Sequence, residues 1–228
     1  MPSARAVIKR LRDLARPDQL EGMARFGIVG KKRLGVSIPD LRRLAKEIGK
    51  DHRLAIRLWR TSIPDAMILA SMIDESRLVT DEQMEDWVKD FNSWDVCDQV
   101  CMNLFDKSPL AWKKVRDWSE RGEEFVKRAG YALLACLAWH DKKTADKKFT
   151  NFFAVIKRGA TDERNYVKKA VNWALRNIGK RNSSLNTSAI KCAEVLLKID
   201  SPAARWIARD ALRELQSESL RRRLPRQA

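Results

Sequence analysis

A five-residue pattern recurs in the C-terminal half of the chain at a constant interval. Residues 125–129 read FVKRA, residues 166–170 read YVKKA and residues 207–211 read IARDA, so each copy begins 41 residues after the one before. Each copy has two apolar residues, a basic residue, any residue and an alanine. A period near 40 residues is typical of proteins in which each unit is a pair of helices and successive units stack. The pattern therefore predicts a helical array in which each unit buries its apolar face against the next.

Helical periodicity and capping residues extend this interpretation along the chain. Ser37 and Pro39 are typical of a helix start, and Thr80 followed by Gln83 resembles a capping box. No stretch shows the period-2 alternation of a strand. The expected helices cover residues 4–15, 18–24, 38–49, 52–60, 64–75, 81–90, 93–106, 108–119, 122–139, 143–157, 163–181, 187–199 and 202–216.

Short connections make these helices antiparallel pairs, about five or six in number by the repeat length. The sequence thus predicts an all-α, HEAT-like helical-repeat solenoid with a concave basic groove. We expect residues 1–228 to form a single domain, with residues 221–228 as a disordered basic tail.

The charge balance favours an anionic partner. The chain has 46 Lys and Arg residues against 30 Asp and Glu residues, a net charge of +16, and its pI is about 10.0. Such a field attracts nucleic acid or an acidic membrane surface. No apolar run approaches the roughly 18–20 residues that cross a bilayer, and the first residues lack the pattern of a signal peptide. We therefore expect no membrane association, and a monomer in the cytoplasm, associated with the nucleoid.

Cysteine and histidine usage argues against a metal site. The four cysteines lie in apolar helical contexts, as reduced core thiols of a cytoplasmic protein do. Cys97 and Cys101 are four residues apart and could share a metal, but His52 and His140 have no spacing that completes a site. We expect no metal and no cofactor.

The stretch FNSWDVCDQVCMNLF at residues 91–105 places an aromatic and a carboxylate on one helical face. Trp94 and Asp98 are four residues apart, which is about one turn. The alternative is that Trp94 belongs to the core and Asp98 is a solvated charge. The 41-residue repeat places Arg128 and Lys169 at equivalent positions, and Trp173 follows Lys169 by four. If residues 93–106 also line the groove, Trp94, Asp98, Arg128 and Trp173 meet on its concave face.

Several motifs resemble those of the AlkD-like family of DNA alkylation repair glycosylases. They are GVSIPDLRRLAKEI at 35–48, WDVCD at 94–98, KRAGY at 127–131 and WALRNIGKR at 173–181. The resemblance implies excision of cationic alkylated purines, such as N3-methyladenine and N7-methylguanine, from double-stranded DNA. It also implies that the lesion is recognised from the backbone side without base flipping.

By the same resemblance, Asp98 is the catalytic carboxylate, Trp94 and Trp173 lie against the lesion's deoxyribose, and Arg128 holds the backbone. The sequence departs from the family at one point. Relatives carry a tyrosine near the N-terminus, and the nearest residue here is Phe26.

The remaining candidates are basic residues that could contact phosphate. They are Lys31, Lys32, Arg33, Lys168, Lys169, Lys180 and Arg181. The other tryptophans, Trp139 among them, are interpreted as packing residues. Two alternatives remain open: a HEAT-repeat protein that binds DNA without catalysis, and a HEAT scaffold for a protein partner.

Overall fold

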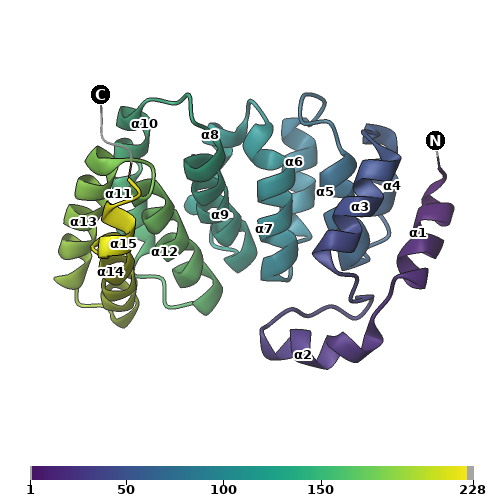
Figure 1. Cartoon of the computed structure of the whole chain (residues 1–228), viewed down its shortest axis with the longest axis horizontal. Helices are drawn as coiled ribbons and strands as arrows, with labels where there is room; N and C mark the ends of the chain where they lie inside the picture. Colours follow the sequence, from purple (N-terminus) through teal and green to yellow (C-terminus); the bar gives the residue numbers. More distant parts are fainter. Residues whose placement is uncertain (1, 225–228) are drawn as a thin grey trace. The chain divides into compact units, whose positions relative to one another are not determined.

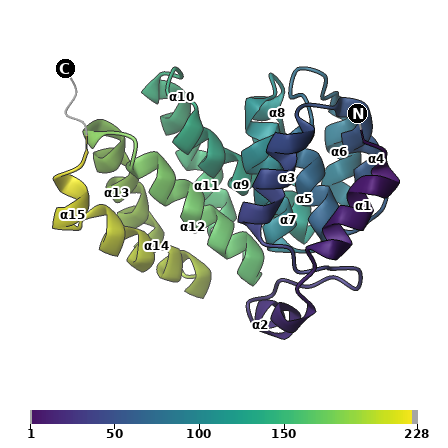
Figure 2. The same cartoon turned by 45° about the vertical axis from the view of Figure 1, so that its right-hand side comes forward.

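The computed structural model describes residues 2–224, and the secondary structure in this range is entirely helical (Figures 1 and 2). The predicted all-α class is therefore confirmed. The chain divides into two compact units, Met1–Ala111 and Trp112–Ala228. The single-domain assignment stays a prediction.

The first unit is built around one apolar helix. Nine of the ten residues of α5 are buried, and α5 packs against α3, α4 and α7. The short helix α2 projects from one end of the unit, on the side where the chain leads into α3 (Figures 1 and 2). The helices of this unit are α1 (Ala4–Asp13), α2 (Leu20–Arg25), α3 (Ile38–Ile48), α4 (His52–Trp59), α5 (Pro64–Ile73), α6 (Asp81–Lys89) and α7 (Trp94–Asn103), with 3-10 turns at Pro17–Gln19 and Phe105–Lys107.

The second unit has α9 and α12 at its centre. All residues from Arg128 to Ala138 in α9 are buried, and this helix packs along α12, which in turn packs against α13 and α14. The helices are α8 (Ala111–Ser119, starting at the boundary), α9 (Glu124–His140), α10 (Asp146–Asn151), α11 (Phe153–Gly159), α12 (Asn165–Gly179), α13 (Ser183–Leu197), α14 (Pro202–Leu215) and α15 (Glu218–Arg221).

Polar contacts between α9, α12 and α14 follow the sequence repeat. Three hydrogen bonds each join residues 38 apart, one from α9 to α12 and two from α12 to α14. They run from Arg128 Nη1 to Tyr166 O at 2.6 Å, from Asn172 Nδ2 to Asp210 Oδ2 at 2.6 Å and from Arg176 Nη1 to Glu214 Oε2 at 2.8 Å. This separation of 38 residues is the 41-residue period of the sequence repeat less about one helical turn. Equivalent helices of successive repeats therefore contact each other in a constant register.

Two of the predicted helices differ from those in the structure. The helix α13 begins at Ser183 rather than at 187, because the Asn182 side chain accepts a hydrogen bond from Leu185 N at 2.9 Å and caps it. The predicted helix 143–157 is two helices, α10 and α11, which meet at Phe152.

The disordered tail predicted at residues 221–228 stays a prediction, although its first residue lies in a helix. Arg221 is the last residue of α15, whose first turn is capped by the Ser217 hydroxyl. Residues 225–228 of that predicted tail lie outside the described residues.

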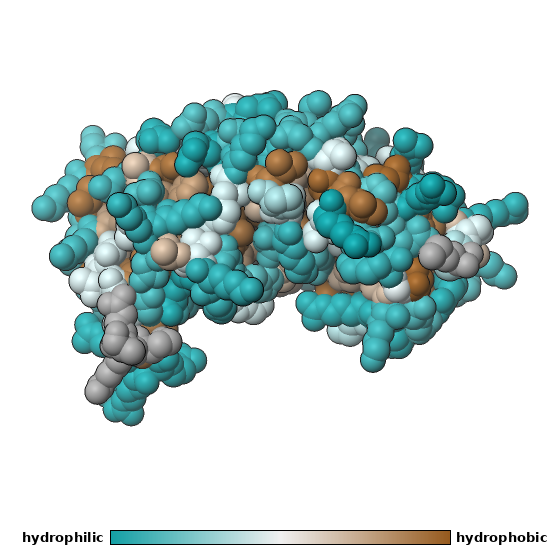
Figure 3. All heavy atoms as spheres, turned by 90° about the horizontal axis from the view of Figure 1, so that it is seen from above, coloured by the Kyte–Doolittle hydropathy of each residue, from teal (hydrophilic) through white to brown (hydrophobic). Residues whose placement is uncertain are grey.

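The face of the molecule seen from above is mostly hydrophilic (Figure 3). Hydrophilic side chains cover most of the face seen in Figure 3, and apolar side chains gather there in separate patches. Among the described residues, no helix combines the length and apolar character needed to span a bilayer.

Candidate active site

Trp94 and Asp98 of α7 reach the surface of the first unit. Val96, Cys97, Val100 and Cys101 are buried and fix the helix in the core of this unit. Trp94 and Asp98 are both partly exposed and lie one turn apart at the start of the helix. The alternative in which Trp94 is a core residue therefore does not describe this structure.

A backbone carbonyl fixes the Trp94 indole. Its Nε1 donates a hydrogen bond of 2.9 Å to the carbonyl oxygen of Phe26, the residue that ends α2. The Phe26 side chain itself is 77% exposed. The residue nearest to the expected N-terminal tyrosine thus contacts the predicted site through its backbone and leaves its ring in solvent.

The loop after Phe26 is anchored at two carboxylates. Arg33 forms a bidentate ion pair with Asp95, at 2.8 and 3.0 Å, and Asp65 accepts hydrogen bonds of 2.8 Å from both Leu34 N and Val36 N. Arg33 is 7% exposed. It was predicted to contact phosphate, but a buried guanidinium requires an internal partner, and Asp95 provides it. Arg33 instead holds the loop on α7.

Lys31 and Lys32 remain exposed on this anchored loop. The Lys32 ammonium reaches Thr61 O at 3.3 Å, on the connection between α4 and α5. Both lysines therefore stay candidates for contact with phosphate, on a loop whose path is fixed by Asp65 and Asp95.

Arg128, in the second unit, is a packing and hydrogen-bonding residue. It is 5% exposed, and its Nη1 donates to the carbonyl oxygen of Tyr166 in the first turn of α12. In this structure the guanidinium fastens α9 to α12, and the contact with DNA predicted for Arg128 stays a prediction. Lys169, the equivalent residue one repeat later, is exposed. The ammonium of Lys168 lies 5.3 Å from the ring of Trp206.

Trp173 is partly exposed and lines a cleft of about 520 Å³ at the end of α9. Trp139 lines the same cleft and is 52% exposed, so its interpretation as a packing residue was wrong. Its position at the end of α9, directly before the polar sequence HDKK, is the signal that could have revealed its exposure. The other lining residues are Ala138, Lys142, Asn177, Lys180 and Arg181.

Arg181 organises the loop beside this cleft. Its Nη1 donates to Ala138 O at 2.9 Å and to Asp141 O at 2.7 Å, and its guanidinium lies 4.0 Å from the Phe149 ring. Burial lowers the pKa of this guanidinium. Arg181 was also predicted to contact phosphate, and it too has a structural role here.

Lys180 is only partly committed to a partner within the protein. Its ammonium lies 3.0 Å from a Glu214 oxygen and stays 34% exposed, so it can still approach an anion.

Trp94 and Asp98 belong to one unit and Arg128 and Trp173 to the other. The expectation that these four side chains share one surface stays a prediction.

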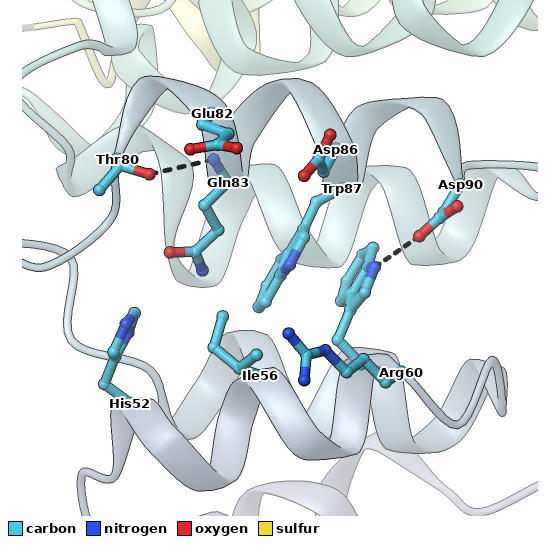
Figure 4. A pocket seen from close by; sticks show the side chains of 10 residues that line it. His52, Ile56, Arg60, Thr80, Glu82, Gln83, Asp86, Trp87 and Asp90 are labelled. Atoms are coloured by element: carbon cyan, nitrogen blue, oxygen red, sulfur yellow. Dashed lines mark hydrogen bonds between the residues drawn. The ribbon is translucent and has the colours of Figure 1, made fainter.

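A second cleft, of about 450 Å³, lies between α4 and α6 of the first unit (Figure 4). Glu82, Asp86 and Asp90 line its α6 side, so its charge is unsuited to nucleic acid. Trp59 and Trp87 stack here at 3.8 Å between ring centroids and are buried, as packing residues should be.

Comparison with known families identifies the chain. The model of the family described as DNA alkylation repair enzyme matches residues 7–215. The chain belongs to the DNA alkylation repair enzyme family. The stretch matched includes the Trp94–Asp98 turn, the anchored loop and the cleft at Trp173.

Solved structures confirm the fold expected of this DNA alkylation repair family member. One is described as "a new family of proteins related to the HEAT-like repeat DNA glycosylases with affinity for branched DNA structures". It matches with a TM-score of 0.77 and 19% identity, over 93% of this chain and 95% of its own. The predicted HEAT-like repeat fold is thereby confirmed.

Two designed proteins match less well. An engineered protein has a TM-score of 0.39 and 13% identity, over 95% of this chain and 99% of its own. A designed armadillo repeat protein in complex with the peptide (KR)4 has a TM-score of 0.37 and 12% identity, over 94% of each chain. No curated protein matches the chain.

Proposed function

We propose that this member of the DNA alkylation repair family is a monofunctional glycosylase that hydrolyses the N-glycosidic bond of cationic alkylated purines in duplex DNA. The observation that carries the proposal is the turn at the start of α7, where Trp94 and Asp98 are both partly exposed. The indole is held in place by Phe26 O at 2.9 Å, so one member of the pair is fixed before substrate arrives.

The chemistry suits a single carboxylate. Cleavage of an N-glycosidic bond develops oxocarbenium character on the deoxyribose, and the Asp98 carboxylate stabilises this charge and orients the attacking water. A purine alkylated at N3 or N7 is already cationic and leaves without protonation by a second acid. The face of the Trp94 ring adds a cation–π contribution of about 0.5–2 kcal/mol.

Recognition of DNA rests on the backbone. Lys31, Lys32 and Lys169 are exposed and carry charges that suit phosphate. Contacts of this kind hold a duplex without reading its bases, which matches a reaction whose selectivity comes from the lability of the lesion. In this scheme the base stays stacked and is not flipped into a pocket.

The second candidate is DNA binding without catalysis. The observation that favours it is Phe26, which stands nearest to the expected tyrosine and exposes its ring. Because a similar structure is described as having affinity for branched DNA, branched DNA is the ligand to test for this candidate. A scaffold for a protein partner would bind duplex DNA weakly, with little dependence on salt.

The deciding experiment is single-turnover release of base from methylated duplex DNA, with products separated as N3-methyladenine and N7-methylguanine. Asp98→Asn keeps the shape and removes the charge, so excision is expected to slow by roughly 10²–10³-fold while DNA binding persists. Asp86→Asn is the matched control, since Asp86 is an exposed carboxylate on α6. No strand cleavage is expected, because no lysine nucleophile takes part.

The outcomes separate the candidates. If the wild-type protein binds the methylated duplex and releases no base, the result supports DNA binding without catalysis. Equal excision by Asp98→Asn and wild type removes Asp98 from the mechanism and leaves the glycosylase activity standing.

A further inference from the structure

The cleft of the second unit has the charge of an anion-binding site. Among the seven described residues that line it are Lys142, Lys180 and Arg181, and none of the seven is acidic. Arg181 is occupied by backbone carbonyls and Lys180 is shared with Glu214, which leaves Lys142 as the exposed cation at the cleft. The cleft volume of about 520 Å³ lies within the roughly 300–1,000 Å³ usual for small-ligand sites.

Trp139 supplies a flat apolar surface at the same place. Its indole is 52% exposed although the residues before it in α9 are buried. One side of the ring stacks against His140, with ring centroids 4.6 Å apart and an angle of 29° between planes. An exposed ring supported on one side by another ring is a stacking platform, and Trp173 provides a second indole in the same cleft.

The loop that carries Lys142 is held in place. Arg181 bonds the carbonyls of Ala138 and Asp141 on the two sides of His140, and its Nη2 reaches Thr144 O at 3.3 Å. Asn182 Nδ2 donates to both carboxylate oxygens of Asp146, at 3.0 and 2.9 Å. Lys142 and Trp139 therefore meet a ligand from a backbone that is already ordered, which reduces the entropy lost on binding.

We propose that this cleft binds one unpaired nucleotide of DNA, with its base stacked on Trp139 and its phosphate bound by Lys142. A base pair inside a duplex has neighbours on both faces and cannot cover the indole, whereas an unpaired base within the duplex can turn a face to it. The cation and the aromatic ring together match a nucleotide better than a free anion, which would leave Trp139 uncovered. The inference rests on the proposed function in one respect, that DNA is the ligand.

The test compares two probes that differ by a single nucleotide. One is a duplex with one unpaired thymidine as a bulge, and the other is the same duplex fully paired. Stacking on an aromatic side chain is worth about 5- to 150-fold in affinity per base, so the wild type is expected to prefer the bulged duplex by a factor in this range. Trp139→Ala should reduce the ratio of the two affinities towards one, and Trp139→Phe should keep most of it.

Two variants control for general losses. Trp206→Ala removes another exposed tryptophan of the second unit, and Lys143→Ala removes the lysine next to Lys142; neither residue lines the cleft. Both should leave the ratio unchanged. Lys142→Ala should weaken binding of the bulged duplex more than binding of the paired one.

Equal wild-type affinity for the two probes would overturn the proposal, and so would an unchanged ratio in Trp139→Ala. The excision assay on methylated duplex is run in parallel. If the wild type prefers the bulged duplex but excises no base, only the glycosylase assignment is contradicted. If the wild type excises the methylated base but shows no preference for the bulged duplex, only this inference is contradicted.

Discussion

The Arg33–Asp95 ion pair gives the sharpest test of how the site in the first unit is held together. The two side chains are 4% and 12% exposed, and two hydrogen bonds of 2.8 and 3.0 Å join them. Removing one partner of a buried pair costs about 3–5 kcal/mol, because the other charge stays buried without its partner. Asp95 also accepts a hydrogen bond from the Ser93 hydroxyl and lies at the start of α7, where the helix dipole favours an anion, so it keeps some stabilisation without Arg33. We therefore expect Arg33→Met to lower the free energy of unfolding by about 3 kcal/mol, the low end of this range.

Arg25→Met is the matched control. Arg25 pairs with Glu21 on the surface of the same unit, with side chains 73% and 81% exposed, and such pairs contribute about 0–1 kcal/mol. In a double-mutant cycle, Arg33→Met combined with Asp95→Asn should cost less than the sum of the single changes, by about 1–3 kcal/mol.

Two measurements follow the change. Urea unfolding should show a midpoint lowered by roughly 1 M or more for Arg33→Met and nearly unchanged for Arg25→Met. Trypsin cleavage after Lys31 and Lys32, under native conditions, should accelerate by about 150-fold if the loop opens locally, the factor that corresponds to 3 kcal/mol. If Arg33→Met matches the Arg25→Met control in both the urea midpoint and the rate of trypsin cleavage, the ion pair does not anchor the loop on α7.

Three further outcomes are expected. Affinity for duplex DNA should fall steeply between about 50 and 200 mM salt, because bound lysines release counterions; salt-independent binding would contradict the phosphate contacts. Gly159→Ala should destabilise the protein by about 1–3 kcal/mol, because a Cβ there would lie 2.0 Å from the Tyr131 hydroxyl, whereas Gly122→Ala has open space and should not. The hydrogen bond from Arg164 holds the pKa of Asp162 well below its usual range, so Asp162→Asn should destabilise at pH 7, and the difference from wild type should shrink as the pH falls below about 4.

Sequence periodicity and capping residues predicted most of the helices. The spacing of apolar residues and the capping side chains of Ser37 and Thr80 placed the starts of α3 and α6 correctly, because a cap is an interaction between residues three apart. The same i to i+4 argument put Trp94 and Asp98 on one helical face. The 41-residue repeat predicted the stacking of α9, α12 and α14.

The partners of the charged residues could not be predicted in this way. Arg33 and Asp95 are 62 residues apart, and Arg181 is 40 residues from Asp141. No local pattern encodes such contacts, so a cation that binds DNA and a cation that holds two segments together look alike in the sequence. Trp139 shows the converse error: residues 129–139 of its helix carry no charge, so the sequence suggests burial, but the exposure of Trp139 is decided by where the helix ends.

Among the predicted phosphate contacts, the arginines have partners inside the protein, whereas Lys180 pairs in part with Glu214 and other lysines are exposed. Three arginines, Arg33, Arg128 and Arg181, are used inside the protein, where the planar guanidinium serves several oxygens at once. The lysines Lys31 and Lys169 stay exposed. A lysine is a flexible point charge that suits phosphates at variable positions but reads no base edge bidentately. Under the proposed function, Lys31 and Lys169 hold a DNA backbone of any sequence, and excision of a lesion anywhere in a genome requires that property.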